Sequence, residues 1–536
     1  MKNLSRRRLL RDAAILGAPV ISGPWLAGCA AQQTPTPAPA PLPDGMTEAV
    51  VASPLGRFRG MRNPKSGIRI FKGIPFIRNP YTAQTRFRAP IPYGPVDGTL
   101  DCLKPGSIPL QPGAGGKMRG GDGPLCLNIW APSEERGKKR PVMVWVPGGG
   151  SIRCDQNDPR FDGTAFAEDG VVLVTLAYRV NVDGFLKIEG GDSNLGIRDI
   201  IEGLRWVKAN IAAFGGDPGR ITAFGQSAGG THLVDVIASP AAKGLLAGAI
   251  IQSPSAVAQW TSDAQAERAA RLVADALGAK PTRESLMAVP VEKLPAFGPL
   301  AGKLSADLEW AQFTDGNTSL FKGWIDSDIM PARPVDAIAR GACAGLAVIA
   351  GSTASEWRYY IVPNGRIGEI REKDVEKLLE GAKRPLDVAS AYRRAGRGET
   401  PGDVFAQIQS DIIFRMPCLK LIESLRKGGA RVWAYDFAWQ SPVKGKSDAA
   451  IGAAHTTDVP FVFKTFDAPR AVASNGSAAP AALADAMHSA WVAFASSGEA
   501  PWAAFDLHAR QAMVFDEKSA VATDPWAFER MVMPAR

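Results

Sequence analysis

Short apolar runs recur along the chain, and their glycine, proline or polar boundaries are typical of buried strands. Four of these runs lie at residues 142–146, 221–224, 346–351 and 431–437. Residues 481–495 instead place apolar side chains at helical spacing and predict an amphipathic helix. Polar or glycine-rich segments follow each of the four runs, so side chains on these loops are the candidates for chemistry.

The pattern Gly-x-Ser-x-Gly at residues 225–229 follows one of these strands and precedes an apolar helix at 231–237. This strand, turn and helix order is that of a nucleophile elbow, in which a sharp turn holds the serine hydroxyl at the helix N-terminus. A side chain in place of either glycine would collide with the neighbouring strands. Ser227 is therefore the candidate nucleophile. The alternative is a plain glycine-rich loop, because the chain contains 56 glycines.

A serine hydroxyl needs a base in contact with it, usually an imidazole that a carboxylate orients. The chain has four histidines, and the base is expected to follow the acid in the sequence. His232 lies on the helix that Ser227 opens and points to a different face, which favours a packing role. His488 lies in the amphipathic helix, and His508 lies near the C-terminus in a loop or at a strand edge. His455, in a loop after a predicted strand, is the candidate base, with a structural role as the alternative.

The orienting acid is expected between the serine and the histidine, just beyond another strand. Glu356 follows the strand at 346–351 and is the candidate. A carboxylate at this place would hold the imidazole in the tautomer that accepts the serine proton. An ordinary surface glutamate is the alternative, which spacing alone does not exclude.

The negative oxygen of a tetrahedral intermediate requires backbone N–H donors that are already in position, and glycine-rich chain can approach closely enough to supply them. The segment Pro-Gly-Gly-Gly at residues 147–150 follows the strand at 142–146. Gly149 and Gly150 are therefore candidate oxyanion donors, and the N–H of Ala228 in the elbow would complete the set. A flexible turn is the alternative interpretation of a triple glycine.

These segments resemble the type-B carboxylesterase and cholinesterase family of the α/β-hydrolase fold, from about residue 50 to residue 526. The blocks that match the family, in order, are Leu127-Asn128-Ile129-Trp130-Ala131-Pro132, Tyr178-Arg179, Gly184-Phe185-Leu186, residues 194–199, Trp206-Val207, Asn210-Ile211, Phe214-Gly215-Gly216-Asp217-Pro218, residues 224–230, Gln252-Ser253, Glu356, residues 452–455, Trp491, Phe494-Ala495 and Pro501-Trp502. The resemblance implies an α/β fold with a central, mostly parallel twisted sheet flanked by helices. Helical insertions would form the cap of the pocket.

The resemblance also implies a serine hydrolase that cleaves carboxylic esters through an acyl-enzyme. The residues that it implies for the site are Ser227 as nucleophile, Glu356 as the orienting acid, His455 as general base and acid, and Gly149, Gly150 and Ala228 as oxyanion donors. The expected partner is a small-molecule ester, and no cofactor is implied. Two alternatives stay open: a non-catalytic binding or adhesion protein on the same scaffold, which the family includes, and a hydrolase of amides or thioesters.

The chain departs from the family pattern at several positions. Pro147 stands where a histidine or tyrosine usually precedes the triple glycine, and Gln226 stands where glutamate is common. Pro124 occupies the position of a family disulfide cysteine, for which Cys102 and Cys126 offer a shifted equivalent. The sequence does not fix this pairing.

Residues 1–28 resemble a bacterial export signal. A twin-arginine-like motif at residues 5–11 precedes an apolar stretch at 13–21 that is too short to span a membrane. A lipoprotein cleavage box follows, in which Cys29 would become the lipidated first residue, and an ordinary signal peptide is the alternative. Residues 29–45 are rich in proline, threonine and alanine and predict an extended tether. We therefore expect an exported, periplasmic or cell-envelope protein that is anchored to a bacterial membrane by a lipid.

Residues 46–536 are expected to form one large α/β-hydrolase domain, because no internal repeat or second linker divides them. The formal net charge of +9 includes the basic residues of the export signal, and no basic cluster with interleaved aromatic residues suggests a nucleic acid partner. Of the six cysteines, the five other than Cys29 leave at least one free thiol, and none are spaced as a zinc site requires. No metal site is predicted, and the sequence does not indicate an oligomeric state.

The walls of the substrate pocket are expected to come from insertions at residues 257–324 and 366–426. Aromatic side chains in the first insertion are candidates for an apolar acyl or alcohol pocket, with a plain core role as the alternative. These side chains are Trp260, Trp310, Phe313, Phe321 and Trp324. They do not decide between short acyl chains and bulky aromatic or polyester substrates.

Overall fold

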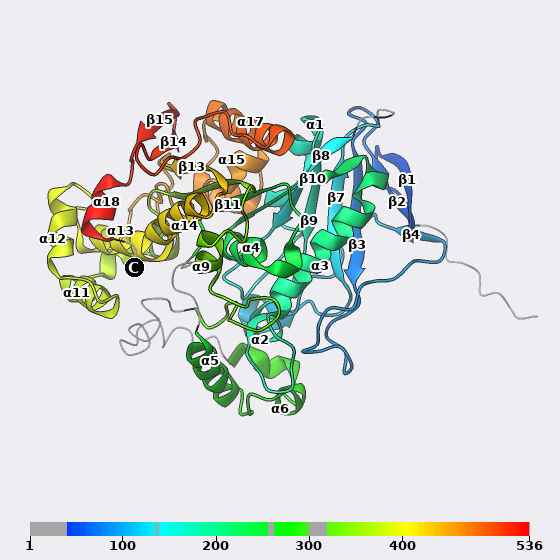
Figure 1. Cartoon of the computed structure of the whole chain (residues 1–536), viewed down its shortest axis with the longest axis horizontal. Helices are drawn as coiled ribbons and strands as arrows, with labels where there is room; N and C mark the ends of the chain where they lie inside the picture. The colour runs from blue at the N-terminus through cyan, green and yellow to red at the C-terminus, as the bar shows by residue number, and fades with distance from the viewer. Residues whose placement is uncertain are drawn as a thin grey trace, which may run out of the picture. The chain divides into compact units, whose positions relative to one another are not determined.

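The fold is organised around a central sheet of thirteen strands, counted over the residues that the computed structural model describes (Figure 1). These are residues 40–534 except 135–136, 138, 256–261, 297–299 and 301–318. The predicted export signal, Cys29 and most of the tether lie outside them. The described residues from 41 onward form one compact unit.

The strand order in the sheet is β1-β2-β3-β7-β9-β8-β10-β11-β12-β13-β14-β15, and β4 pairs with β2. The strands are β1 (Thr47–Ser53), β2 (Gly56–Arg62), β3 (Arg69–Ile77), β4 (Thr99–Asp101), β7 (Leu125–Ala131), β8 (Arg140–Val146), β9 (Val172–Leu176), β10 (Gly216–Gln226), β11 (Gly248–Gln252), β12 (Ala347–Thr353), β13 (Arg431–Phe437), β14 (Gln511–Phe515) and β15 (Ala520–Thr523). Two further strands, β5 (Gln111–Pro112) and β6 (Met118–Arg119), pair with each other.

All strands from β9 to β14 in this order are parallel to their neighbours. The outer strands β1, β2, β3 and β7 on one side, and β15 on the other, are antiparallel additions. The carboxyl ends of the parallel strands meet at one edge of the sheet, which is where α/β proteins bind ligands. The loops after β8, β10, β12 and β13 are therefore brought together at that edge.

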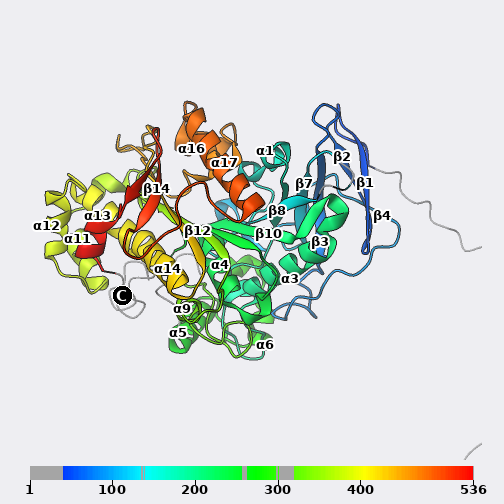
Figure 2. The ribbon, with the colours of Figure 1, turned by 45° about the horizontal axis from the view of Figure 1, so that its top comes forward.

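Helices cover both faces of the sheet (Figure 2). α3, α4 and α14 pack on one face, whereas α1 and α17 pack on the other. The helices are α1 (Thr164–Glu168), α2 (Asn181–Phe185), α3 (Leu195–Asn210), α4 (Ala228–Ala238), α5 (Asp263–Ala276), α6 (Arg283–Met287), α9 (Pro334–Ala339), α10 (Arg358–Ile361), α11 (Glu372–Gly381), α12 (Asp387–Arg394), α13 (Pro401–Ser410), the π-helix η7 (Asp411–Arg415), α14 (Met416–Lys427), α15 (Val459–Phe463), α16 (Pro469–Asn475), α17 (Ala481–Ser497) and α18 (Ala527–Val532).

The central strands are buried on both faces, which explains why they appear as continuous apolar runs in the sequence. Every residue of β9, β11 and β12 is buried. Side chains on one face of the sheet join a core with α3, α4 and α14, and those on the other face join a second core that includes Trp145, Phe224 and Trp491. Parallel strands under two helical layers cannot alternate apolar and polar residues.

The predicted elements match the observed ones closely. The runs at 142–146, 221–224, 346–351 and 431–437 become β8, β10, β12 and β13, and the helix at 481–495 becomes α17. The predicted insertions contain α5 and α6 in the first case, and α11 to α14 in the second. Within the described residues, no helix is both long enough and apolar enough to cross a membrane.

Cys102 and Cys126 do not form the shifted disulfide that the family resemblance suggested. Both thiols are free and buried, and burial raises the pKa of each to about 12. Their sulfur atoms face backbone carbonyls instead, because Cys102 Sγ lies 3.6 Å from the Leu100 oxygen and Cys126 Sγ lies 3.5 Å from the Pro124 oxygen.

Candidate active site

Ser227 occupies the turn between β10 and α4 with φ 60° and ψ −129°. A positive φ is uncommon for a residue other than glycine, and here it places the side chain at the tip of a sharp turn. The Ser227 N–H donates to the carbonyl of Gln252 on β11 at 2.9 Å, which fixes the turn against the sheet. A Cβ atom on Gly229 would lie 2.0 Å from the carbonyl oxygen of Val146, so β8 leaves room only for glycine there.

Glu356 and His455 meet beside this turn. Glu356 Oε2 lies 2.5 Å from His455 Nδ1, and the His455 backbone N–H donates to the Glu356 carbonyl at 3.1 Å. The second carboxylate oxygen, Oε1, accepts the N–H of Thr353 at 2.8 Å. Both side chains are buried, with 0% of Glu356 and 2% of His455 exposed. The carboxylate therefore fixes the ring at Nδ1 and directs Nε2 away from itself.

Gln226, the residue before the serine, covers one face of the His455 ring. Its Nε2 atom lies 3.3 Å from His455 Nδ1 and 3.2 Å from His455 Nε2. The amide nitrogen is thus almost equally far from the two ring nitrogens. In the plane of the ring, such a position would bring it too close to Cε1, the carbon between them. The amide nitrogen therefore lies over the face of the ring. The amide therefore leaves the in-plane lone pair of Nε2 uncovered.

Three aromatic rings surround the rest of His455. Phe414, from η7, lies 4.6 Å from the imidazole between ring centroids, and Tyr360, from α10, stacks on it at 5.7 Å. Tyr359 approaches edge-on at 5.9 Å. Tyr359 and Tyr360 remain more than a third exposed, so they extend this aromatic wall from the buried base toward the surface. Aromatic faces stabilise a cation that forms beside them.

The glycine loop after β8 is folded into a tight turn. The N–H groups of Ile152 and Arg153 both donate to the Gly149 carbonyl, at 3.1 and 3.0 Å. Before the turn, the Tyr178 hydroxyl donates to the Pro147 carbonyl at 2.6 Å. Within the described part of the chain, the N–H groups of Gly149 and Gly150 donate to no protein acceptor. Free N–H groups in a fixed turn suit the binding of a negative oxygen.

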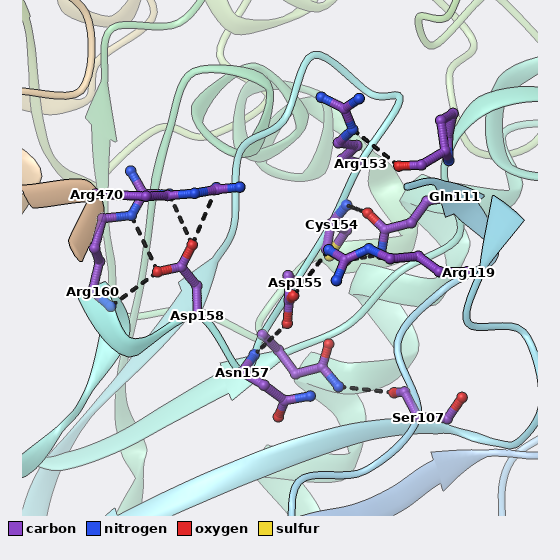
Figure 3. A network of polar contacts seen from close by, with 12 residues as sticks. Ser107, Gln111, Arg119, Arg153, Cys154, Asp155, Asn157, Asp158, Arg160 and Arg470 are labelled. Atoms are coloured by element: carbon purple, nitrogen blue, oxygen red, sulfur yellow. Dashed lines mark hydrogen bonds and ion pairs between the residues drawn. The ribbon is translucent and has the colours of Figure 1, made fainter. Parts of the chain in front are cut away.

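The chain beyond the glycine loop is also fixed by polar contacts (Figure 3). Gln111 donates to the Cys154 carbonyl at 2.7 Å and accepts the Cys154 N–H at 3.0 Å. The Arg153 guanidinium donates to the Pro112 carbonyl at 3.1 Å. Ion pairs continue this network at Arg119–Asp155, Arg160–Asp158 and Arg470–Asp158. The turn of the glycine loop is thus held at both of its ends.

A buried carboxylate that the sequence reading did not single out lies under the histidine loop. Asp458, three residues after His455, accepts a hydrogen bond from Gln252 Nε2 at 2.8 Å. Gln252 Oε1 in turn accepts the indole N–H of Trp491 at 3.2 Å. Asp458 is fully buried, and burial raises its pKa to about 6. In the sequence, Asp458 is marked only by its place three residues after His455, and this place does not reveal that the carboxylate is buried.

In the described part of the chain, none of the other three histidines forms a hydrogen bond with the Ser227 hydroxyl. His232 is buried on α4, where its Nε2 atom lies 3.0 Å from the Ser151 hydroxyl. His488 is buried on α17, where its Nδ1 atom lies 2.6 Å from the Val462 carbonyl, and burial lowers its pKa. His508 is exposed in a loop. The packing role expected for His232 agrees with its burial.

The structure tests two of the five aromatic side chains that were candidates for the pocket. Phe321 is 1% exposed and belongs to the main core. It therefore has a plain core role and does not line the pocket. The Trp324 ring is covered by the Lys187 ammonium at 5.4 Å from its centroid. Trp260, Trp310 and Phe313 lie outside the described residues.

Comparisons with known proteins identify relatives along almost the whole chain. The model of the carboxylesterase family matches residues 47–525. Para-nitrobenzyl esterase of Bacillus subtilis (strain 168) is 30% identical over 505 residues, which cover 90% of this chain and 98% of that protein. Phenmedipham hydrolase of Pseudarthrobacter oxydans is 32% identical over 416 residues, which cover 75% of this chain and 80% of that protein.

A solved structure gives the same result for the fold. A carboxylesterase of Geobacillus stearothermophilus superposes with a TM-score of 0.77 at 31% sequence identity, and the match covers 90% of this chain and 99% of that one. The predicted α/β-hydrolase fold is therefore confirmed. The family match and these esterase relatives together show that the chain belongs to the carboxylesterase family and is a carboxylic ester hydrolase.

Proposed function

We propose that the protein hydrolyses carboxylic esters through an acyl-enzyme on Ser227. The Ser227 Oγ attacks the carbonyl carbon of the ester while His455 Nε2 takes the hydroxyl proton. The tetrahedral intermediate then collapses, the bond to the alcohol oxygen breaks, and the alcohol leaves with the proton from His455. Water repeats the sequence on the acyl-enzyme, which releases the acid and restores Ser227.

The observation that carries this proposal is the 2.5 Å contact between Glu356 Oε2 and His455 Nδ1. A carboxylate that accepts the Nδ1 proton leaves the lone pair on Nε2, which is the atom that must act as base. The same carboxylate stabilises the imidazolium that forms when the proton arrives. Among the described residues, Ser227 Oγ and His455 form no hydrogen bond, and such contacts tighten in the complex with substrate.

We assign the oxyanion donors to Gly149, Gly150 and Ala228. The first two have free N–H groups in the fixed turn after β8, and Ala228 is the first residue of α4. The N-terminus of a helix favours negative charge. The Pro147 carbonyl accepts the Tyr178 hydroxyl at 2.6 Å, which supports a fixed start of the glycine loop.

The experiment is turnover of a nitrophenyl ester series, from acetate to decanoate, by the protein and by Ser227→Ala, with fluorophosphonate labelling of both. The series suits a relative of para-nitrobenzyl esterase. Removal of the nucleophile should lower turnover by a factor on the order of 10^4 to 10^6 and abolish labelling. Turnover that survives in a folded Ser227→Ala protein would exclude this serine. Loss of both signals in the wild-type protein would favour a binding protein instead.

We also propose that the enzyme is exported and anchored to a bacterial membrane by a lipid on Cys29. The twin-arginine-like motif, the cleavage box and the proline-rich tether support this location. Cys29→Ala should release the enzyme from the membrane fraction, and Arg6→Lys with Arg7→Lys should keep it inside the cell as a precursor. A Cys29→Ala protein that still sediments with membranes would refute the lipid anchor.

A further inference from the structure

The residue after the triple glycine is tied to the helix that carries the nucleophile. Ser151 Oγ lies 3.0 Å from His232 Nε2, across a separation of 81 residues in the sequence. Both side chains are buried, with 4% of Ser151 and 1% of His232 exposed. His232 lies on α4, the helix that Ser227 precedes. One hydrogen bond therefore joins the glycine loop to the helix that positions the serine.

The His232 ring is held in place by its own neighbours. Its Nδ1 atom faces Asp235 Oδ2 at 3.5 Å, and its face stacks on Phe185 with a centroid distance of 4.5 Å. The Tyr178 ring packs against its edge at 5.5 Å. Burial raises the pKa of Asp235, and burial lowers the pKa of the nearby Lys322 to about 7. A fixed ring in such a dry environment presents Nε2 to Ser151 in a single orientation.

Ser151 itself is held in an unusual backbone conformation. Its φ is 59°, in the left-handed region that serine rarely adopts. Its carbonyl accepts the Asn181 N–H at 2.6 Å. The bond from the Ser151 hydroxyl to His232 adds a side-chain contact to this backbone contact. Strained conformations persist only where the surroundings fix them from several directions.

We propose that His232 is a positioning residue, which acts through Ser151 to hold the N–H groups of Gly149 and Gly150 at their working distance from Ser227. This inference rests on the proposed function. Without the bond, the donors would shift relative to the developing oxyanion, although the contacts that bind the ground-state ester would remain. kcat should therefore fall while KM stays nearly constant.

The first test is a double-mutant cycle in the full chain with Ser151→Ala, His232→Phe and the combined variant. A displacement of about 1 Å can lower a rate 10²-fold, so each single variant should lose about 10- to 100-fold in kcat on nitrophenyl acetate. Because both changes remove the same bond, the combined variant should lose no more than the worse single variant. Losses that multiply, or that appear in KM, would overturn the proposal.

A transition-state analogue separates positioning from general damage. The Ki of a trifluoromethyl ketone, which forms an oxyanion when Ser227 adds to it, should rise in Ser151→Ala by the factor that kcat falls. The Ki of benzyl alcohol, a neutral alcohol that carries no oxyanion, should not change. An unchanged Ki for the ketone would overturn the proposal, even if His232→Phe proves too unstable to assay.

His488→Phe is a matched control, because it replaces a second buried histidine by the same residue. His488 lies on α17 with its ring 4.5 Å from Phe166, and its polar partners are Val462 and Asp169. The His488→Phe protein should be less stable than the wild type and should keep the wild-type kcat. An equal kcat loss in His488→Phe would assign the effect in His232→Phe to destabilisation and overturn the proposal.

The outcomes also distinguish this inference from the proposed function. Turnover that survives in Ser227→Ala would refute the proposed function, and this inference with it. Serine-dependent turnover that stays intact in Ser151→Ala would refute this inference alone. If none of the esters is a substrate, the rate of fluorophosphonate labelling at Ser227 takes the place of kcat, because phosphonylation uses the same N–H donors.

Discussion

Glu356 and His455 are linked twice, once through the 2.5 Å contact of Oε2 with Nδ1 and once through the backbone at 3.1 Å. Glu356→Gln would present an amide N–H to Nδ1, so Nδ1 would have to accept and Nε2 would carry the proton. The wrong tautomer cannot take the proton of Ser227. We expect kcat to fall by a factor on the order of 10^4, measured on nitrophenyl acetate.

Glu356→Asp is the control for this change, because it keeps the charge on a side chain that is one methylene shorter. It should retain more activity than Glu356→Gln at equal stability. Full turnover in Glu356→Gln would exclude Glu356 as the orienting acid. The buried carboxylate of Asp458, three residues beyond His455, would then be the next candidate.

The sequence was sufficient to place four strands of the sheet and to nominate Ser227, Glu356 and His455 as candidates, because each comes after an apolar run that is buried on both faces. The α/β-hydrolase prediction is confirmed by the solved relatives. The contacts that surround these candidates were not predictable. The Ser151–His232 bond joins positions 81 residues apart, and its partners carry no pattern that distinguishes them from other buried polar residues. The rotamers and packing that create such contacts are set only by the tertiary structure.

The shifted disulfide shows the same limit. A motif indicates that two cysteines lie on neighbouring segments, but a bond also requires their Cβ atoms to point at one another. In the structure the two sulfur atoms face carbonyl groups of their own segments.

Gln226 places a neutral amide over the His455 ring where a carboxylate is common in the family, and this difference should appear in the pH profile. In Gln226→Glu, a carboxylate on the ring face would favour the protonated imidazole. A base that holds its proton more tightly loses activity at a higher pH. We expect the acid limb of the kcat/KM profile to move up by about one pH unit.

Gln226→Met is the neutral control, of similar size but without the amide. Its acid limb should not move to higher pH. If Gln226→Glu also leaves the profile unchanged, the group at position 226 does not act on the titrating base.

The glycine loop offers a pair of adjacent substitutions with opposite expectations. Gly149 has φ 137°, and a Cβ atom there would lie 2.2 Å from the Arg153 carbonyl oxygen. Gly149→Ala should therefore displace the oxyanion donors and lower kcat by about 10² or more. Gly150 has φ 64°, and a Cβ atom there would meet no atom within 4 Å. Gly150→Ala should cost about 1 kcal/mol in stability and keep turnover of the small acetate ester. Equal losses in both variants would contradict this geometry.

Asp458 should make the protein less stable as the pH rises from about 4 to about 6. Its pKa is raised by burial to about 6 from the usual 3.8, so the folded chain binds its proton more tightly than the unfolded chain does. The unfolded state therefore holds fewer protons in this window, and the free energy of unfolding falls with increasing pH. The Gln252 amide opposes the shift, whereas the charge of Glu356 supports it.

Asp458→Asn removes this titration and keeps an oxygen that can accept from Gln252. A shift of about two pH units corresponds to about 3 kcal/mol, so the variant should gain roughly that much stability relative to wild type between pH 4 and pH 8. Thermal denaturation of both proteins across this range measures the difference. Asp336→Asn, which changes an exposed carboxylate on α9, should show no such trend. A constant difference in Tm between Asp458→Asn and wild type would mean that Asp458 has the same pKa in the folded and the unfolded chain, because only a carboxylate whose protonation changes on unfolding produces a pH-dependent difference.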